Sequence, residues 1–263
     1  MRTRPKHKLT NAPLSLVLAQ VRFSPLFLMG EYVPRIQDQL RQEGYPVNAS
    51  VMVKEFQLAP SVSGARDREH WEFMSKDRRT SVVVTEGFVV LQTTAYDDFE
   101  HFIAQLKAVV ATVSDTVGGV LVERIGLRYV DAIVPKPGES WRQYVRATLH
   151  GFDSPLFNEA KTLRLHQTVA ETDVGQIIVR LHQNLEAAVL PPDLGTGELK
   201  AQPTFAKPGE VVTLVDIDHF TKFEASREYD PSHLETIAWT LKEGAYAMFA
   251  DHVVTPYALK VWK

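Results

Sequence analysis

The amino-acid sequence runs twice through one order of elements: a strand, a short helix, a group of strands and a long helix. In the first half, strand patterns at 70–76, 79–85 and 88–95 are separated only by short polar turns. Turns this short join antiparallel neighbours, whereas parallel strands need a long crossover between them. The regular alternation of strands with helices that builds a parallel sheet is missing. The sequence therefore predicts an α+β fold in which an antiparallel sheet carries helices on one face.

The long helix of each half has clear end signals. Asp97 and Glu100 have the spacing of a capping box, and apolar residues recur at three- and four-residue steps from Phe99 to Val117, before two glycines. This pattern predicts a helix of about five turns with one buried face. In the second half, Asp230 followed by Pro231 predicts the cap and first turn of another amphipathic helix.

Short patterns place the remaining elements. The first half has a strand at 14–23, a helix at 32–43, a strand at 51–58 and an exposed loop at 60–68; the second has a strand at 121–134, a helix at 140–149, a hairpin within 161–184, a connection at 185–209, a strand at 211–220 and a C-terminal helix from 255. The connection is long and rich in proline and glycine, so we expect it to be the most mobile internal segment.

The two halves, 1–119 and 120–263, are thus predicted to be pseudo-duplicated strand-helix-(three or four strands)-helix units. Their element order is similar to the layout of TATA-binding-protein-like or helix-grip folds. Each half offers a small sheet with one apolar face, and such a sheet is marginal alone. We therefore expect the halves to fold as one cooperative body.

The composition excludes several classes of protein. The 263 residues include no cysteine, which removes disulfides and thiol nucleophiles and suits a reducing compartment. No apolar run reaches the about 18 residues of a membrane span, and the basic N-terminus has no secretory signal behind it. We expect a cytoplasmic protein that does not bind membranes. The net charge of −3 disfavours a general polyanion binder, so nucleic acid is not the favoured partner.

The common catalytic and cofactor motifs are absent from the sequence. It has no phosphate-binding loop, dinucleotide-binding glycine motif, serine-hydrolase elbow or zinc-protease helix, so no cofactor, metal or catalytic residue is predicted. Asp216, Asp218 and His219 lie on one predicted strand, but alternation puts the aspartates on one face and the histidine on the other. We expect the aspartates to form ion pairs with basic residues of a neighbouring strand.

Basic and titratable residues gather on one face of the predicted hairpin. The tripeptide Arg-Leu-His occurs at 164–166 and again at 180–182, and a turn centred near Asp173 would set Arg164 opposite His182 and His166 opposite Arg180. The other face would then carry apolar residues that meet the helices, namely Leu163, Leu165, Val169, Ile177, Val179 and Leu181.

The long strand at 121–134 extends this basic face by the same alternation. Arg124 and Arg128 share one of its faces, and Gln20 and Arg22 of the first strand can continue the set. Guanidinium groups bind phosphate and carboxylate through two parallel hydrogen bonds. The predicted ligand-binding residues are Arg124, Arg128, Arg164, His166, Arg180 and His182.

Three stretches of the chain resemble one family. They are the opening LTNAPLSLVLAQVRFSP, the central RIGLRYVDAIVP from Arg124 to Pro135, and the terminal FADHVVTPYALKVW from Phe249 to Trp262. They are similar to sporadically distributed bacterial proteins of about 260 residues that share an RIGLRY strand. The resemblance implies a bacterial cytosolic protein, and no residue takes a role from it because no activity is assigned to that family.

Four interpretations stay open at this point, three for the basic face and one for the protein as a whole. The basic face is a solvated face with ordinary ion pairs, or it binds an anionic ligand or a protein partner. Alternatively, a histidine serves as general base in nucleotide or phosphoester chemistry, although no partner for it can be assigned. A structural subunit that docks a complex through 185–209 is the fourth. We favour a ligand- or partner-binding sensor protein over an enzyme.

Overall fold

The computed structural model describes residues 9–59, 62–158, 162–186, 190–191, 193–194, 198–200 and 211–263. In these residues nine strands form one antiparallel sheet in the order β2-β3-β4-β5-β1-β6-β9-β8-β7. The strands are β1 (Leu14–Phe23), β2 (Val47–Ala59), β3 (Val62–Met74), β4 (Thr80–Val84), β5 (Phe88–Thr93), β6 (Leu121–Ile133), β7 (Arg164–Thr172), β8 (Gly175–Glu186) and β9 (Val211–Glu228). The predicted α+β class with an antiparallel sheet is confirmed.

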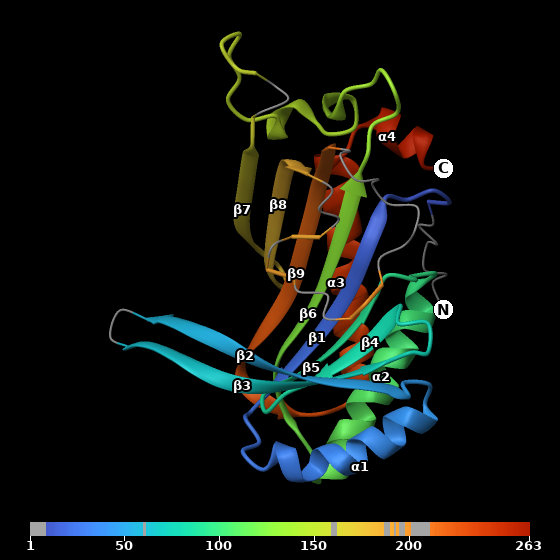
Figure 1. The fold of residues 1–263 in the computed structure, drawn as a ribbon, viewed down its shortest axis with the longest axis vertical. Coiled ribbons are helices and arrows are strands. Elements are labelled where there is room, and N and C mark those ends of the chain that lie inside the picture. Colours follow the sequence, from blue (N-terminus) through green and yellow to red (C-terminus); the bar gives the residue numbers. More distant parts are fainter. Residues whose placement is uncertain are drawn as a thin grey trace.

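Four α-helices accompany the sheet in the described residues. They are α1 (Met29–Gln42), α2 (Phe99–Val117), α3 (Pro231–Ala247) and α4 (Pro256–Val261). Helices α2 and α3 lie behind the sheet in Figure 1, so we call this helix-covered side the rear face and the side towards the viewer the front face. None of the described helices is long and apolar enough to cross a membrane.

The helix ends follow the signals in the sequence. Asp98 caps α2 by accepting a hydrogen bond from the backbone N–H of His101, one residue later than the predicted cap. Asp230 caps α3 with Pro231 at the first helical position. A carboxylate at this place satisfies a backbone donor that the helix leaves unpaired and suits the positive end of the helix dipole.

Three predicted segments differ from the structure. The loop expected at 60–68 is wrong, because β3 begins at Val62 and pairs with β2 along its whole length; residues 60–61 lie outside the described part. The helix expected at 140–149 is two short 3₁₀ turns, 141–143 and 147–149. Strand β9 continues to Glu228, well beyond the predicted end.

The misassigned loop has a physical explanation in the shape of the β2–β3 hairpin. Figure 1 shows this hairpin projecting away from the body of the sheet, beyond the helices. A ribbon that leaves the body of the sheet has no helix to cover one of its faces, so its strands need not alternate apolar with polar residues. The polar, glycine-containing sequence of 62–68 is therefore compatible with a strand, although it resembles a loop.

The main core lies between the helices and the rear face of the sheet. It joins residues from both halves of the chain, and Phe99 of α2 packs against Trp239 of α3 with ring centroids 4.6 Å apart. The central strand pair, β1 with β6, also joins the first half to the second. Each half starts at this centre, crosses to an edge of the sheet with its second strand, β2 or β7, and returns to the centre with its last strand, β5 or β9.

A small apolar cluster forms on the front face. Leu16, Val130 and Leu214 lie there, and Leu199 from the segment between β8 and β9 packs against them. The backbone of Lys200 bonds to the carbonyl of Arg78 at 2.8 Å. We call residues 187–210 the connection segment; 187–189, 192, 195–197 and 201–210, including Gly195-Thr196-Gly197, lie outside the described residues. Its described parts thus pack on the front face.

Candidate functional site

The register of the β7–β8 hairpin decides which predicted site residues share a face. Thr172 pairs with Gly175, which sets Arg164 opposite Gln183 and Gln167 opposite Arg180. The predicted pairs Arg164–His182 and His166–Arg180 are therefore wrong by one residue. Residues that are directly opposite in an antiparallel pair point to the same face, so a shift of one residue moves a side chain to the other face.

Two of the six predicted ligand-binding residues consequently point to the rear face. Arg164 is buried, donates from Nη1 to Oε1 of Gln183 at 3.0 Å, and lies 3.5 Å from a carboxylate oxygen of Asp153. His166 contacts Oγ1 of Thr168 at 3.0 Å. The apolar set is divided in the same way, because Ile177, Val179 and Leu181 are buried whereas Leu163, Leu165 and Val169 are exposed.

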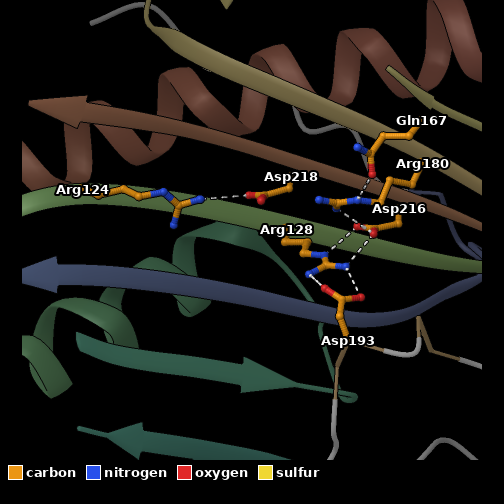
Figure 2. A network of polar contacts seen from close by, with 7 residues as sticks. All are labelled: Arg124, Arg128, Gln167, Arg180, Asp193, Asp216 and Asp218. Carbon is orange, nitrogen blue, oxygen red and sulfur yellow. Dashed lines mark hydrogen bonds and ion pairs between the residues drawn. The ribbon is translucent and has the colours of Figure 1, made fainter. Parts of the chain in front are cut away.

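The other four predicted residues share the front face. Strand registers place Arg128 beside Asp218, and Asp216 beside Arg180. Figure 2 shows Arg124, Arg128 and Arg180 with three aspartates and Gln167. We call the six charged residues Arg124, Arg128, Arg180, Asp193, Asp216 and Asp218 the arginine–aspartate network. The prediction that Asp216 and Asp218 pair with basic residues of neighbouring strands is confirmed.

Arg128 is the centre of this network. Its guanidinium donates to Asp216 from Nε at 2.7 Å and from Nη2 at 2.6 Å, and to Asp193 from Nη1 at 2.8 Å and from Nη2 at 3.1 Å. Burial alone lowers the pKa of Arg128, but the bonds to both aspartates outweigh that effect and raise it. Each of the two carboxylates therefore accepts two hydrogen bonds from the buried guanidinium. This bidentate arrangement is the strongest geometry for an arginine–carboxylate pair.

The two aspartates of Arg128 differ in their surroundings. The side chain of Asp216 is fully buried, whereas that of Asp193 is 59% exposed. Asp216 also accepts a hydrogen bond from Nη1 of Arg180 at 3.1 Å, and Nε of Arg180 donates to Gln167 at 3.0 Å. Asp216 is thus a fixed part of the sheet, while Asp193 reaches Arg128 from the connection segment.

Arg124 occupies a second, more loosely paired position. It donates to Gln20 at 2.7 Å, lies 3.6 Å from Asp218, and stacks over the ring of Phe220 at 4.0 Å. Burial lowers the pKa of Arg124 and raises that of Asp218, and their mutual attraction only partly opposes this. Gly126 makes room for the guanidinium, because a Cβ there would be 2.9 Å from its Nη1.

His182 lies on the front face near the same aspartates. Burial lowers its pKa below the usual value, although the charges of Asp216 and Asp193 oppose this shift. The imidazole is therefore neutral near pH 7. An ordinary histidine gains its proton near pH 6.5 and could then strengthen the binding of an anion. His182 needs a lower pH for this, so we expect no such gain near pH 6.5.

His219 is separated from the aspartates that flank it in sequence. It points to the rear face, where Nδ1 contacts the carbonyl of Leu241 at 2.9 Å and Nε2 contacts Oγ1 of Thr172 at 3.1 Å. Burial lowers its pKa. The described residues contain no group of three acidic, histidine or cysteine side chains placed to hold a metal ion.

Sequence reasoning missed Asp193 and Gln167 as members of this site. Asp193 follows Pro191-Pro192 in a segment without periodicity, so no pattern indicates which strand it meets. Gln167 was obscured by the register error, since its partner Arg180 was assigned to His166. The one available signal for Asp193 is chemical: two arginines, Arg128 and Arg180, beside the single aspartate Asp216 leave a positive charge to be balanced.

Comparison with known proteins adds no family to this geometry. No protein-family model matches the chain, and none of the curated proteins compared with it matches its sequence.

Proposed function

We propose that this chain is a binding protein whose front face recognises an anionic group through Arg128, with Arg180 and His182 beside it. In the ligand-free protein, Asp193 of the connection segment holds the place of that group. The proposal takes the protein to be bacterial and cytosolic, which the absence of cysteine suits. The ligand class is a carboxylate or phosphate, since both accept two parallel hydrogen bonds from one guanidinium.

The observation that supports the proposal is the unequal exposure of the two carboxylates on Arg128. Asp216 is inaccessible, but Asp193 is more than half exposed and comes from outside the sheet. The bonds of Asp193 to Nη1 and Nη2 occupy the edge of the guanidinium that Asp216 leaves available. An external anion that displaces Asp193 inherits both bonds without disturbing the buried pair.

The charge balance also favours a ligand that replaces Asp193 over a ligand that binds in addition to it. Arg124, Arg128 and Arg180 face three aspartates, so the complete network is neutral. Without Asp193 the same residues carry one net positive charge, placed beside a neutral His182. An anion is therefore attracted only where the internal carboxylate leaves, and the ligand competes with Asp193 for one site.

The test is the substitution Asp193→Asn, with pyrophosphate and citrate as probes. While Asp193 occupies the guanidinium of Arg128, a probe cannot bind there. The apparent affinity for the probe is therefore the intrinsic affinity multiplied by the fraction of molecules in which Asp193 has left. An ion pair with one exposed partner contributes about 1 kcal/mol, so its removal should tighten binding of a probe about 5-fold. Isothermal titration calorimetry at low salt measures this change directly, and Arg128→Lys should abolish the gain because lysine lacks the planar fork.

A matched control is Asp153→Asn. The side chain of Asp153 is 55% exposed and pairs with Arg142 and Arg164, away from the front-face network. This control should leave probe binding unchanged. Equal or weaker binding by Asp193→Asn than by the wild type would overturn the role of Asp193, and failure of both proteins to bind any anion would overturn the proposed function.

The strand order supports a second element of the proposal, the duplicated layout. Both halves start with a central strand, β1 or β6, and place their last strand, β5 or β9, beside it. We propose that this reflects a pseudo-duplicated, TATA-binding-protein-like arrangement. The match is incomplete, because the first half has five strands and the second has four in the described residues. Site residues lie in the second half together with β1, so the two halves have diverged in use.

A further inference from the structure

Strand β7 forms an edge of the sheet without the usual protection. It is the last strand in the sheet order, and no described strand pairs with its outer side. Its nine residues contain neither lysine nor proline, and its pairing with β8 has no register shift. Natural edge strands are normally short, irregular, covered or charged in the middle, since an open row of backbone donors and acceptors invites another strand.

The opposite edge provides a contrast within the same sheet. Strand β2 has the sequence VNASVMVKEFQLA, with Lys54 and Glu55 near its middle. The charges of β7, Arg164 and Glu171, lie at or near its ends. One edge therefore carries the expected central charges, and the other does not.

Exposed apolar side chains concentrate on β7 and in the segment that precedes it. Of eleven exposed large hydrophobic residues among the described side chains, six fall within 152–169: Phe152, Leu156, Phe157, Leu163, Leu165 and Val169. Leu165 is 66% exposed and Val169 is 49% exposed. Both share the front-facing side of β7 with Gln167, to which they are spaced symmetrically. Such clustering marks an interaction surface on a soluble protein.

This symmetric spacing identifies the partner strand. We propose that two copies of the chain pair through β7 in antiparallel orientation, centred on Gln167, so that their sheets join into one. In this register Leu165 of each copy is opposite Val169 of the other, and the two Gln167 residues face each other. A two-fold axis through Gln167 is the natural symmetry of such a pair. This inference rests on the edge strand and not on anion binding, although Gln167 also accepts a hydrogen bond from Arg180 of the arginine–aspartate network.

The acidic residue of β7 favours the same antiparallel arrangement. Glu171 lies near the end of the strand on its front-facing side, the side of Leu165 and Val169. Parallel pairing of two copies in register would place their Glu171 side chains next to each other, which destabilises a sheet. Antiparallel pairing centred on Gln167 separates them. Arg164 points to the rear face and lies 3.5 Å from Asp153, so it takes no part in this contact.

The absence of cysteine makes a direct test of the register simple. In the full-length protein, Gln167→Cys introduces a single thiol at the proposed axis. Opposite residues of an antiparallel pair have Cα atoms about 4.5–5.5 Å apart, within the range of about 4.4–6.8 Å that a disulfide bridges. Mild oxidation should therefore give a covalent dimer. The control Glu171→Cys should not, because its two copies would lie eight residues apart along the strands, about 27 Å at about 3.4 Å per residue.

A second measurement follows the unmodified association. Sedimentation velocity over a range of concentrations should show a monomer–dimer equilibrium, and Leu165→Lys combined with Val169→Lys should weaken it at least about 10-fold, since charges replace both apolar pairs. The control Phe27→Lys, at an 86% exposed site in the first half, should leave it unchanged. A wild-type protein that stays monomeric at all concentrations overturns the inference. This holds also where β7 binds a strand of another protein in place of a second copy. Crosslinking at 171 instead of 167 overturns the register.

Discussion

Asp216 is the most deeply buried charged residue of the arginine–aspartate network. Its carboxylate is fully buried and accepts hydrogen bonds from both Arg128 and Arg180. A buried carboxylate costs free energy unless it is paired, and the cations that pair with it depend on it in turn. The stability of the network therefore depends mainly on Asp216, whereas Asp193, whose side chain is 59% exposed, contributes less to it.

This division of roles predicts different stabilities for two substitutions that each remove one charge. Asp216→Asn leaves two guanidinium groups short of a partner and should lower the free energy of unfolding by about 3–5 kcal/mol. Asp193→Asn should lower it by at most about 1 kcal/mol, because that carboxylate is more exposed to solvent. Urea unfolding of both variants measures the difference. Similar losses for the two would show that Asp193 is a structural partner and not an exchangeable one.

Asp131 is a buried acid on the rear face. It is 5% exposed, and burial raises its pKa from 3.8 to about 7. The folded protein therefore retains a proton between pH 3.8 and about 7 that the unfolded chain has lost. The contribution of Asp131 to stability becomes less favourable as pH rises through this window and is constant above it.

The expected consequence is that Asp131→Asn stabilises the protein in a pH-dependent manner. The amide cannot ionise, so the gain should be small at pH 4 and about 1–3 kcal/mol at pH 8. Thermal unfolding across this range provides the measurement. The control Asp38→Asn removes an exposed carboxylate on α1, so a gain that appears in both variants does not come from Asp131. A gain that is largest at pH 4 would contradict the assigned direction of the pKa shift.

At the scale of elements, helix α3 and strand β9 make an unusually close contact. Gly244 of α3 lies over the buried His219, and a Cβ at position 244 would come within 2.6 Å of the imidazole. His219 cannot easily move, since both its ring nitrogens contact fixed partners, the Leu241 carbonyl and the Thr172 hydroxyl. The glycine is thus required by packing and not by backbone conformation.

This contact predicts that Gly244→Ala destabilises the protein although alanine favours helices. The gain in helix propensity is at most about 1 kcal/mol, and overpacking against a fixed ring costs about 1–3 kcal/mol. We expect a net loss of stability in urea unfolding. The neighbouring exposed change Glu243→Ala should be close to neutral. A more stable Gly244→Ala protein would mean that His219 rotates away at little cost.

The hairpin β7–β8 shows where sequence reasoning succeeds and where it ends. Local signals predicted most of the strands and the long helices, because caps, turns and periodicity act within a few residues. The register depends on whether the turn is centred on Asp173, as predicted, or between Asp173 and Val174, as the structure has it. This difference of half a residue places Arg164 and His166 on the rear face. A turn of two residues closes the hairpin here. The composition of the segment does not distinguish this turn from one centred on a single residue, so it does not show which residues are opposite each other.

The arginine–aspartate network illustrates a second limit. Arg124, Arg128, Arg180 and His182 were predicted to share a face, and strand alternation was sufficient for that because they lie on β6 and β8 around β9. Asp193 could not be placed, since its contact with Arg128 spans 65 residues and starts in an irregular segment. Long-range contacts of this kind depend on the assembled sheet and have no local signal.

At the scale of the whole molecule, the core does not respect the boundary between the two halves. Trp239 and Leu234 of α3 belong to the same apolar cluster as Phe99 and Phe102 of α2. Polar contacts cross the boundary as well, because the hydroxyl of Tyr229 donates to the carbonyl of Lys107 at 2.9 Å. Separating the halves would expose both this core and the facing edges of β1 and β6.

We therefore predict that fragments 1–119 and 120–263 do not fold independently. Each should be insoluble, or should show poorly dispersed amide resonances and no cooperative melting, because its sheet would lose the central β1–β6 pairing and the helix contacts across it. Co-expression should restore a soluble complex with a single thermal transition, since the missing partner supplies the same contacts without a covalent link. Two well-dispersed fragments that melt cooperatively on their own would show instead that the halves are separate domains. That outcome would also require the Phe99–Trp239 contact to be dispensable, which Trp239→Ala in the intact chain tests by the stability it costs, expected to be about 3–5 kcal/mol for a buried aromatic residue.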